Sequence, residues 1–183
     1  MSGIYIHIPF CKQACHYCDF HFSTNLKKKD EMVLALAKEI EMRKSEFQDE
    51  IVETIYFGGG TPSILQIADL KFLIDAVYKN YKVVENPEIT VEANPDDLTE
   101  NRIIELSNNK VNRLSIGIQS FFEDDLQLMN RAHNVEEAKK CLEIATHYFD
   151  NISIDLIYGV PEMSNEKWLQ NIETALSFGV PHI

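Results

Sequence analysis

The stretch ETIYFGGGTPSILQIADLKFLIDAVYKNY, residues 53–81, contains one complete unit of strand, loop and helix. The β-branched and aromatic residues of 53–57 predict a strand, and the three glycines that follow predict its end. Apolar residues then recur at helical spacing, at positions 67, 70, 74, 77 and 81, which predicts a helix with one apolar face. A strand that leads through a short loop into a helix is the repeating unit of parallel sheets.

The same rhythm repeats on both sides of this stretch. Further strands are predicted at residues 5–9, 88–93, 113–119 and 152–157, and further long helices at 30–47 and 165–178. Five βα units in succession predict an α/β fold, with a parallel sheet and right-handed crossovers.

Three more helices are predicted from their start signals. Thr99 is a suitable N-cap residue, and Ser120 with Glu123 and Asn134 with Glu137 have the spacing of a capping box. The last helix is expected to end at Gly179, and residues 180–183 have the pattern of a sixth strand that begins there. We therefore expect the chain to be a truncated piece of a longer domain.

Each predicted strand ends in polar residues or glycine. The loop with the cysteines follows the first strand, glycines 58–60 follow the second, and Glu92, Gln119 and Asp155 lie at the ends of the others. Sites in α/β folds gather at the carboxyl ends of parallel strands, and a barrel brings these ends around one opening. This pattern favours a barrel over a doubly wound sheet.

Composition excludes several classes of protein. The chain has 183 residues, of which 45% are hydrophobic, so it is long and apolar enough to form a folded domain. Its formal net charge of −12 argues against nucleic-acid binding, which needs a basic surface. We see no transmembrane segment and no signal peptide, and we expect a cytoplasmic protein whose four cysteines are reduced.

Three of the four cysteines lie in the segment FCKQACHYCDF, residues 10–20. Cys11, Cys15 and Cys18 have the spacing C-x3-C-x2-C, and three thiolates from one loop can ligate three irons of a [4Fe–4S] cluster. The fourth iron is then open to a chelating ligand, such as the amino and carboxylate groups of S-adenosylmethionine (SAM). Electron transfer into the sulfonium of SAM breaks a C–S bond, and this chemistry belongs to the cofactor.

The same spacing has two other interpretations. His7, His16 and His21 are near enough in sequence to complete a zinc site, and the thiols could also be simple buried side chains. Cys141 differs from the other three, since it lies in a helical apolar pattern that predicts a small buried residue.

Several motifs, in order along the chain, resemble those of the oxygen-independent coproporphyrinogen III oxidase family of radical SAM proteins. They are YIHIPFCxxxCxYC from residue 5, YFGGGTPS at 56–63, VEANP at 91–95, NRLSIGIQSF at 112–121, NRAH at 130–133 and DLIYGVP at 155–161. The resemblance implies a partial (β/α)6 barrel, similar to a TIM barrel, followed by a C-terminal domain. Residues 1–183 would then be the N-terminal part of the radical SAM core domain, with about five βα units and no C-terminal domain.

The resemblance also implies roles for residues. Gly59, Gly60 and Thr61 match the family's loop at the methionine end of SAM, where a missing Cβ lets the backbone approach a ligand. The other implied SAM contacts are polar or aromatic residues, namely Tyr5, Tyr17, Glu92, Gln119, Arg131 and Asp155. No residue is assigned as catalytic.

One departure separates two branches of the family. The oxidases carry a further cysteine two residues after the third ligand, where this chain has Phe20. Phe20 and the short N-terminus resemble the heme-chaperone branch, which implies heme as cargo and an apo-hemoprotein as acceptor. The alternative is the oxidase itself, an enzyme that decarboxylates the propionates of coproporphyrinogen III.

Overall fold

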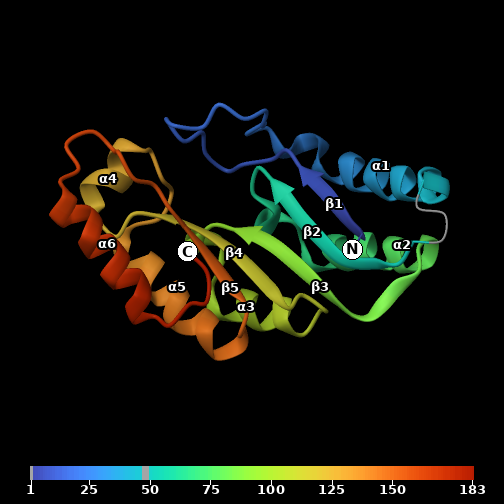
Figure 1. The fold of residues 1–183 in the computed structure, drawn as a ribbon. Coiled ribbons are helices and arrows are strands. Elements are labelled where there is room, and N and C mark those ends of the chain that lie inside the picture. The colour runs from blue at the N-terminus through green and yellow to red at the C-terminus, as the bar shows by residue number, and fades with distance from the viewer. Residues whose placement is uncertain (1, 47–49) are drawn as a thin grey trace.

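Five parallel strands form one sheet in the order in which they occur along the chain (Figure 1). This computed structural model describes residues 2–46 and 50–183. The strands are β1 (Ser2–Ile8), β2 (Val52–Gly59), β3 (Val83–Ala93), β4 (Arg113–Gln119) and β5 (Ile152–Leu156). The predicted α/β class, parallel sheet and strand order are confirmed. Among the described residues β1 and β5 are the edges of the sheet, so the barrel is partial.

In the described part of the chain six helices follow or connect these strands, and short 3₁₀ turns accompany the first three of them. They are α1 (Lys29–Met42), α2 (Ile67–Asn80), α3 (Glu100–Ser107), α4 (Glu123–Leu128), α5 (Val135–Tyr148) and α6 (Asn165–Ser177). In Figure 1 the helices α2, α3 and α5 lie along one side of the sheet, while the loop that carries the cysteines, in blue, extends over the other side. Within the described part of the chain no helix is long and apolar enough to cross a membrane.

The two faces of the sheet differ in chemistry because side chains alternate along each strand. On the helix side lie fully buried apolar residues such as Phe57, Val91 and Ile116. The opposite face carries polar and aromatic side chains, and the register aligns them in rows: Tyr5 pairs with Tyr56, Glu92 with Ser115, and Gly117 with Asp155. A parallel sheet covered by helices on both faces would be apolar on both. The polar face therefore lines a site.

Two of the predicted helix starts are confirmed. The side chain of Thr99 accepts a hydrogen bond from the N–H of Arg102, and Asn134 with Glu137 forms a complete capping box. The end of the last helix also agrees, since Gly179 follows α6 with a φ of 68°, a left-handed conformation that glycine adopts without steric cost.

Four sequence-based boundaries are wrong. Strand β1 begins at Ser2 and ends at Ile8, and not at residues 5 and 9. The helix predicted at 30–47 ends at Met42, and its predicted last residue, Phe47, lies outside the described residues. Strand β3 begins at Val83 and not at residue 88. Ser120 does not cap a helix, because α4 begins three residues later with Phe122 as its N-cap.

Residues 180–183 lie beside β5. The N–H of Ile154 donates to the carbonyl of His182 over 3.1 Å, and Ser153 and His182 form an isolated parallel bridge. The predicted beginning of a sixth strand is thus represented in the structure by this one bridge.

Candidate functional site

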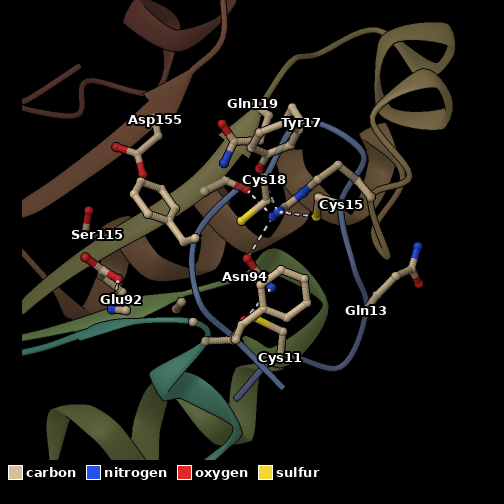
Figure 2. A pocket seen from close by; sticks show the side chains of 18 of the residues that line it. Cys11, Gln13, Cys15, Tyr17, Cys18, Glu92, Asn94, Ser115, Gln119 and Asp155 are labelled. Carbon is tan, nitrogen blue, oxygen red and sulfur yellow. Dashed lines mark hydrogen bonds between the residues drawn. The ribbon is translucent and has the colours of Figure 1, made fainter. Parts of the chain in front are cut away.

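A cavity of about 450 Å³ opens at the carboxyl ends of the strands (Figure 2). This volume lies within the usual range for small-molecule sites. Its lining includes every residue that the sequence predicts for the site: Cys11, Cys15, Cys18, Tyr5, Tyr17, Gly59, Gly60, Thr61, Glu92, Gln119, Arg131 and Asp155. Residues from all five βα units therefore meet at one place, as the strand-end argument requires.

The cysteine loop is closed at its base by main-chain hydrogen bonds. The N–H of Cys11 donates to the carbonyl of Ser23 over 3.1 Å, and the N–H of Ser23 donates to the carbonyl of Pro9 over 2.8 Å. Within the loop the N–H of Cys18 donates to the carbonyl of Cys15 over 3.2 Å. Local turns and this closed base therefore hold the three thiols on one side of the cavity.

The glycine loop after β2 packs directly against the cysteine loop. The N–H of Gly60 donates to the carbonyl of Ile8 over 2.8 Å, and the N–H of Thr61 donates to that of Phe10 over 2.7 Å. A Cβ at Gly60 would lie 2.6 Å from the carbonyl oxygen of Phe10 and 3.0 Å from Sγ of Cys11. Only glycine allows this approach, which explains the residue type at this position.

Glu92, near the end of β3, supports the same glycine loop. Its Oε2 accepts from the N–H of Gly59 over 2.9 Å, and its Oε1 accepts from the hydroxyl of Tyr56 over 2.8 Å. Gly59 has a φ of 116°, so the turn depends on glycine. An ionised carboxylate has about four acceptor positions, and Glu92 retains capacity for a ligand that enters the cavity.

Arg131 connects the cysteine loop to the sheet. Its Nη1 donates to Sγ of Cys15 over 3.4 Å and to the hydroxyl of Tyr17 over 3.2 Å. Its Nη2 donates to Oδ1 of Asn94 over 2.7 Å and to the carbonyl of Gly117 over 2.9 Å. Its buried Nε has no partner among the described residues. The half-buried guanidinium therefore places a positive group beside the sulfur of Cys15.

Gln119 and Asp155 contribute polar groups from the last two strands. Gln119 has a φ of 69°, and its carbonyl accepts from the N–H of Ile157 over 2.9 Å. Burial raises the pKa of the Asp155 carboxyl above its ordinary value, and the nearby charge of Glu92 raises it further. The family resemblance implies both residues as SAM contacts, and both line the cavity.

The thiols differ in their surroundings. Burial raises the pKa of the Cys11 thiol, a hydrogen bond with Thr61 lowers it, and the neighbouring Cys18 and Cys15 raise it again, so the three sulfurs are close enough to interact. Cys141, in contrast, is buried among apolar residues of α5, and burial raises its pKa to about 12. This agrees with the apolar role predicted for it.

Of the histidines considered for zinc, His7 and His21 line the same cavity as the thiols, and His7 bonds the hydroxyl of Tyr5. His16 instead bonds the carbonyl of Leu128 through Nδ1. Across residues 2–46 and 50–183 no group of three or more His, Cys, Asp and Glu side chains is arranged to hold one metal ion. A cubane makes a different demand, because each thiolate binds a different iron.

Some site residues were not assigned from the sequence. Ser115 and Asn94 line the cavity, and the side-chain amide of Asn94 joins Arg131 to Thr61. Gln13 and Asn130 bond each other across the cysteine loop. Asn94 and Asn130 lie within the motifs VEANP and NRAH, so their motif membership was the available signal.

Comparison with known proteins agrees with the site. The model of the radical SAM superfamily matches residues 5–181. The heme chaperone HemW of Bacillus subtilis is 38% identical over 100% of the chain, and the HemW of Escherichia coli is 36% identical over 99%. The chain spans about half the length of these relatives, 49% in both cases.

A solved structure agrees as well. The coproporphyrinogen III oxidase (HemN) of Escherichia coli, described as a radical SAM enzyme, superposes with a TM-score of 0.87 at 29% identity, covering 97% of this chain and 42% of its own. The methyltransferase TsrM from Kitasatospora setae superposes with a TM-score of 0.67 at 12% identity over 97% of this chain and 35% of its own, which shows a shared fold alone. By its fold, its cysteine loop and the family match over residues 5–181, the chain belongs to the radical SAM superfamily.

Proposed function

We propose that this chain is part of a heme chaperone, a radical SAM protein that binds heme and transfers it to an apo-hemoprotein. Membership of the superfamily implies a [4Fe–4S] cluster and SAM. The observation that carries the proposal is the convergence of Cys11, Cys15 and Cys18 on one cavity that is also lined by the residues proposed to bind SAM. The relatives that match the whole chain are named heme chaperones.

The three thiols fit the ligands of a cluster with one open iron. They come from one loop, their charges interact, and Arg131 supplies a positive charge beside Cys15. In this proposal each thiolate binds one iron, and Gly60 leaves room for the loop because it lacks a Cβ. A cluster held in this way, once reduced by an external electron donor, would supply electron-transfer chemistry to bound SAM.

The remaining residues hold and orient SAM in this proposal. The loop of Gly59, Gly60 and Thr61 receives the methionine end, and Arg131 pairs with the methionine carboxylate. The other proposed contacts accept or donate hydrogen bonds around the nucleoside: Tyr5, Tyr17, Glu92, Gln119 and Asp155. The raised pKa of Asp155 suits a carboxyl that shares a hydrogen bond with a ribose hydroxyl.

Phe20 favours the chaperone over the oxidase. It lies two residues after Cys18, lines the cavity and is 80% exposed. An exposed aromatic ring at this edge adds an apolar surface and no further thiolate. Because clusters need reduced thiolates, the proposal includes a reducing compartment, the cytoplasm.

The oxidase remains the second candidate, since the HemN structure superposes with a TM-score of 0.87. In that case the protein is an oxidoreductase of the coproporphyrinogen dehydrogenase type. The two functions make different demands, because a chaperone must bind and release heme unchanged whereas an oxidase must turn over coproporphyrinogen III.

The experiment compares these activities in the full-length protein. After anaerobic reconstitution, heme binding is followed by absorbance, transfer is followed with an apo-hemoprotein, and turnover of coproporphyrinogen III is measured in parallel. We expect stoichiometric heme binding and transfer with no turnover. Turnover without stable heme binding would instead establish the oxidase.

A further inference from the structure

A second segment, residues 128–131, holds the cysteine loop although it contains no proposed cluster ligand. This segment begins at Leu128, the last residue of α4, and continues into the turn that follows. The main-chain N–H of His16 donates to the carbonyl of Met129 over 3.0 Å, and Nδ1 of His16 lies 3.0 Å from the carbonyl oxygen of Leu128. A carbonyl can only accept, so Nδ1 carries the proton. Both bonds attach the loop at the position after Cys15.

Two side-chain amides complete the attachment. Nε2 of Gln13 donates to the main-chain carbonyl of Asn130 over 2.8 Å and to its Oδ1 over 2.9 Å. Nδ2 of Asn130 donates in return to the carbonyl of Ala14 over 2.8 Å. Gln13 and Ala14 lie between Cys11 and Cys15, so these three bonds fix the backbone between two of the thiols.

The backbone of Asn130 is adapted to this contact. Its φ is 55°, in the left-handed region, which asparagine adopts more readily than most other residues apart from glycine. On the other side of the loop, Lys12 forms ion pairs with Asp96 and Asp97. The loop is therefore held from two sides, and loss of one attachment loosens it without unfolding the sheet.

We propose that Gln13 and Asn130 form an amide latch that holds the cysteine loop in its ligand geometry before iron binds. The latch residues are positioning residues, since they act on the thiols through the loop backbone. Ordering a flexible loop at the moment of metal binding costs conformational entropy, and a loop that is already ordered avoids this cost. This inference rests on the proposed cluster.

The test uses full-length protein with three variants and one control. Asn130→Gly removes the amide and keeps a residue that accepts a positive φ, while Gln13→Met removes the donor at similar size. The third variant combines both changes. Lys110→Gly is the control, because Lys110 also has a positive φ, 65°, but lies in the turn before β4, away from the cysteine loop.

We expect a chelator to remove iron from the reconstituted latch variants on the order of tenfold faster than from wild type, as the loss of one or two such bonds implies. The EPR signal of the cluster should broaden, and the melting temperature of the cluster-free protein should stay near that of wild type. The double variant removes all three bonds, so it should lose iron faster than either single variant, but by less than the product of the two single effects, because the two residues contact each other.

A second readout does not need the cluster. In the cluster-free protein the amide of His16 should exchange with solvent faster in both single variants than in wild type or Lys110→Gly. Wild-type iron retention together with wild-type His16 exchange would overturn the latch, and so would equal effects in Lys110→Gly. If wild type takes up no iron, the proposed function fails, while the exchange of His16 still decides whether the latch holds the loop.

Discussion

Gln119 has a strained backbone at the edge of the cavity. Its φ of 69° lies in the left-handed region, which costs a residue with a side chain on the order of 1–3 kcal/mol. The strain is maintained by the bond from the N–H of Ile157 to its carbonyl, at the point where the pairing of β4 with β5 shifts register. This backbone conformation turns the side chain toward the cavity, where we propose that it contacts SAM.

Replacing Gln119 with glycine should separate stability from binding. Glycine accepts the positive φ, so we expect the free energy of unfolding in urea to stay the same or to rise by up to about 1 kcal/mol. Without the side chain, SAM should perturb the EPR signal of the cluster less than in wild type. Glu162→Gly is the matched control, since Glu162 also has a positive φ of 66° and does not line the cavity. A full SAM effect in Gln119→Gly would contradict the proposed contact.

His133 is a buried base that the fold keeps neutral. Its side chain is almost fully buried, and its Nε2 donates to the carbonyl of Ile118 over 3.1 Å. Among the described residues its Nδ1 has no partner. Burial, and then the charge of Arg131, lower the pKa of His133 to about 4.

This depressed pKa predicts a loss of stability in acid. The unfolded chain takes up a proton near pH 6.5 and the folded protein near pH 4, so stability falls as pH drops through this window. The free energy of unfolding should be about 2 kcal/mol lower at pH 5 than at pH 7 because of this group. Glutamine cannot be protonated in this range. Between pH 7 and pH 5 the free energy of unfolding of His133→Gln should therefore fall by about 2 kcal/mol less than that of wild type. Identical pH profiles of wild type and His133→Gln in urea unfolding would contradict the account.

At the scale of elements, a buried polar network joins α4 to α6. Oγ of Ser120 donates to Asp125 over 2.7 Å, and Nζ of Lys167 donates to the same carboxylate over 2.6 Å. Asn171, which is fully buried in α6, accepts from the N–H of Phe121 over 2.7 Å. Residues 128–131, which hold the cysteine loop, begin at the end of α4. By fixing α4, this network therefore also fixes the segment that holds the cysteine loop.

Breaking the network at Lys167 should destabilise the protein. Lys167→Met leaves Asp125, whose side chain is 3% exposed, as a buried carboxylate without its cation. Removing one partner of a buried pair costs 3–5 kcal/mol, and the 18% exposure of Lys167 reduces the expected loss to about 2–3 kcal/mol in urea unfolding. Lys71→Met removes one side of an exposed i,i+4 pair and should cost less than about 0.5 kcal/mol. Equal losses in the two variants would contradict a special role for the network.

The same network explains why one helix start was predicted wrongly. The spacing of Ser120 and Glu123 satisfies a capping box, but the hydroxyl of Ser120 binds Asp125 and accepts from the N–H of Phe122. Asp125 and Phe122 are close in sequence, but the partners that hold this arrangement, Lys167 and Asn171, come from α6 and have no short-range signature. The side chain of Asn134 instead accepts from the N–H of Glu137, and there the capping box forms as predicted.

At the scale of the whole molecule, the alternation of side chains determines both the core and the site. Apolar residues of β4 such as Leu114 and Ile116 face the helices, while Ser115 and Gly117 face the cavity. This period of two is visible in the sequence, so the parallel sheet and the strand-end site could be predicted. The contacts of Gln13 with Asn130 join residues 117 apart, and no local pattern predicts such a pair.

The cysteine loop is the point on which the whole account depends. Cys11, Cys15 and Cys18 are the only cysteines that line the cavity among the described residues, and the fourth, Cys141, is buried in α5. A cluster held by three thiolates has no substitute when one is removed. Cys141→Ala removes a thiol of the same kind from the core and serves as the control, since it affects packing alone.

The most direct measurement is iron per chain after anaerobic reconstitution of full-length wild type, Cys15→Ala and Cys141→Ala. We expect about four irons per chain in wild type and Cys141→Ala, as a [4Fe–4S] cluster contains, and no stable cluster in Cys15→Ala. Addition of SAM should change the EPR signal of the two loaded proteins. Wild-type iron content in Cys15→Ala, or one zinc per chain in a wild type that takes up no iron, would contradict the account.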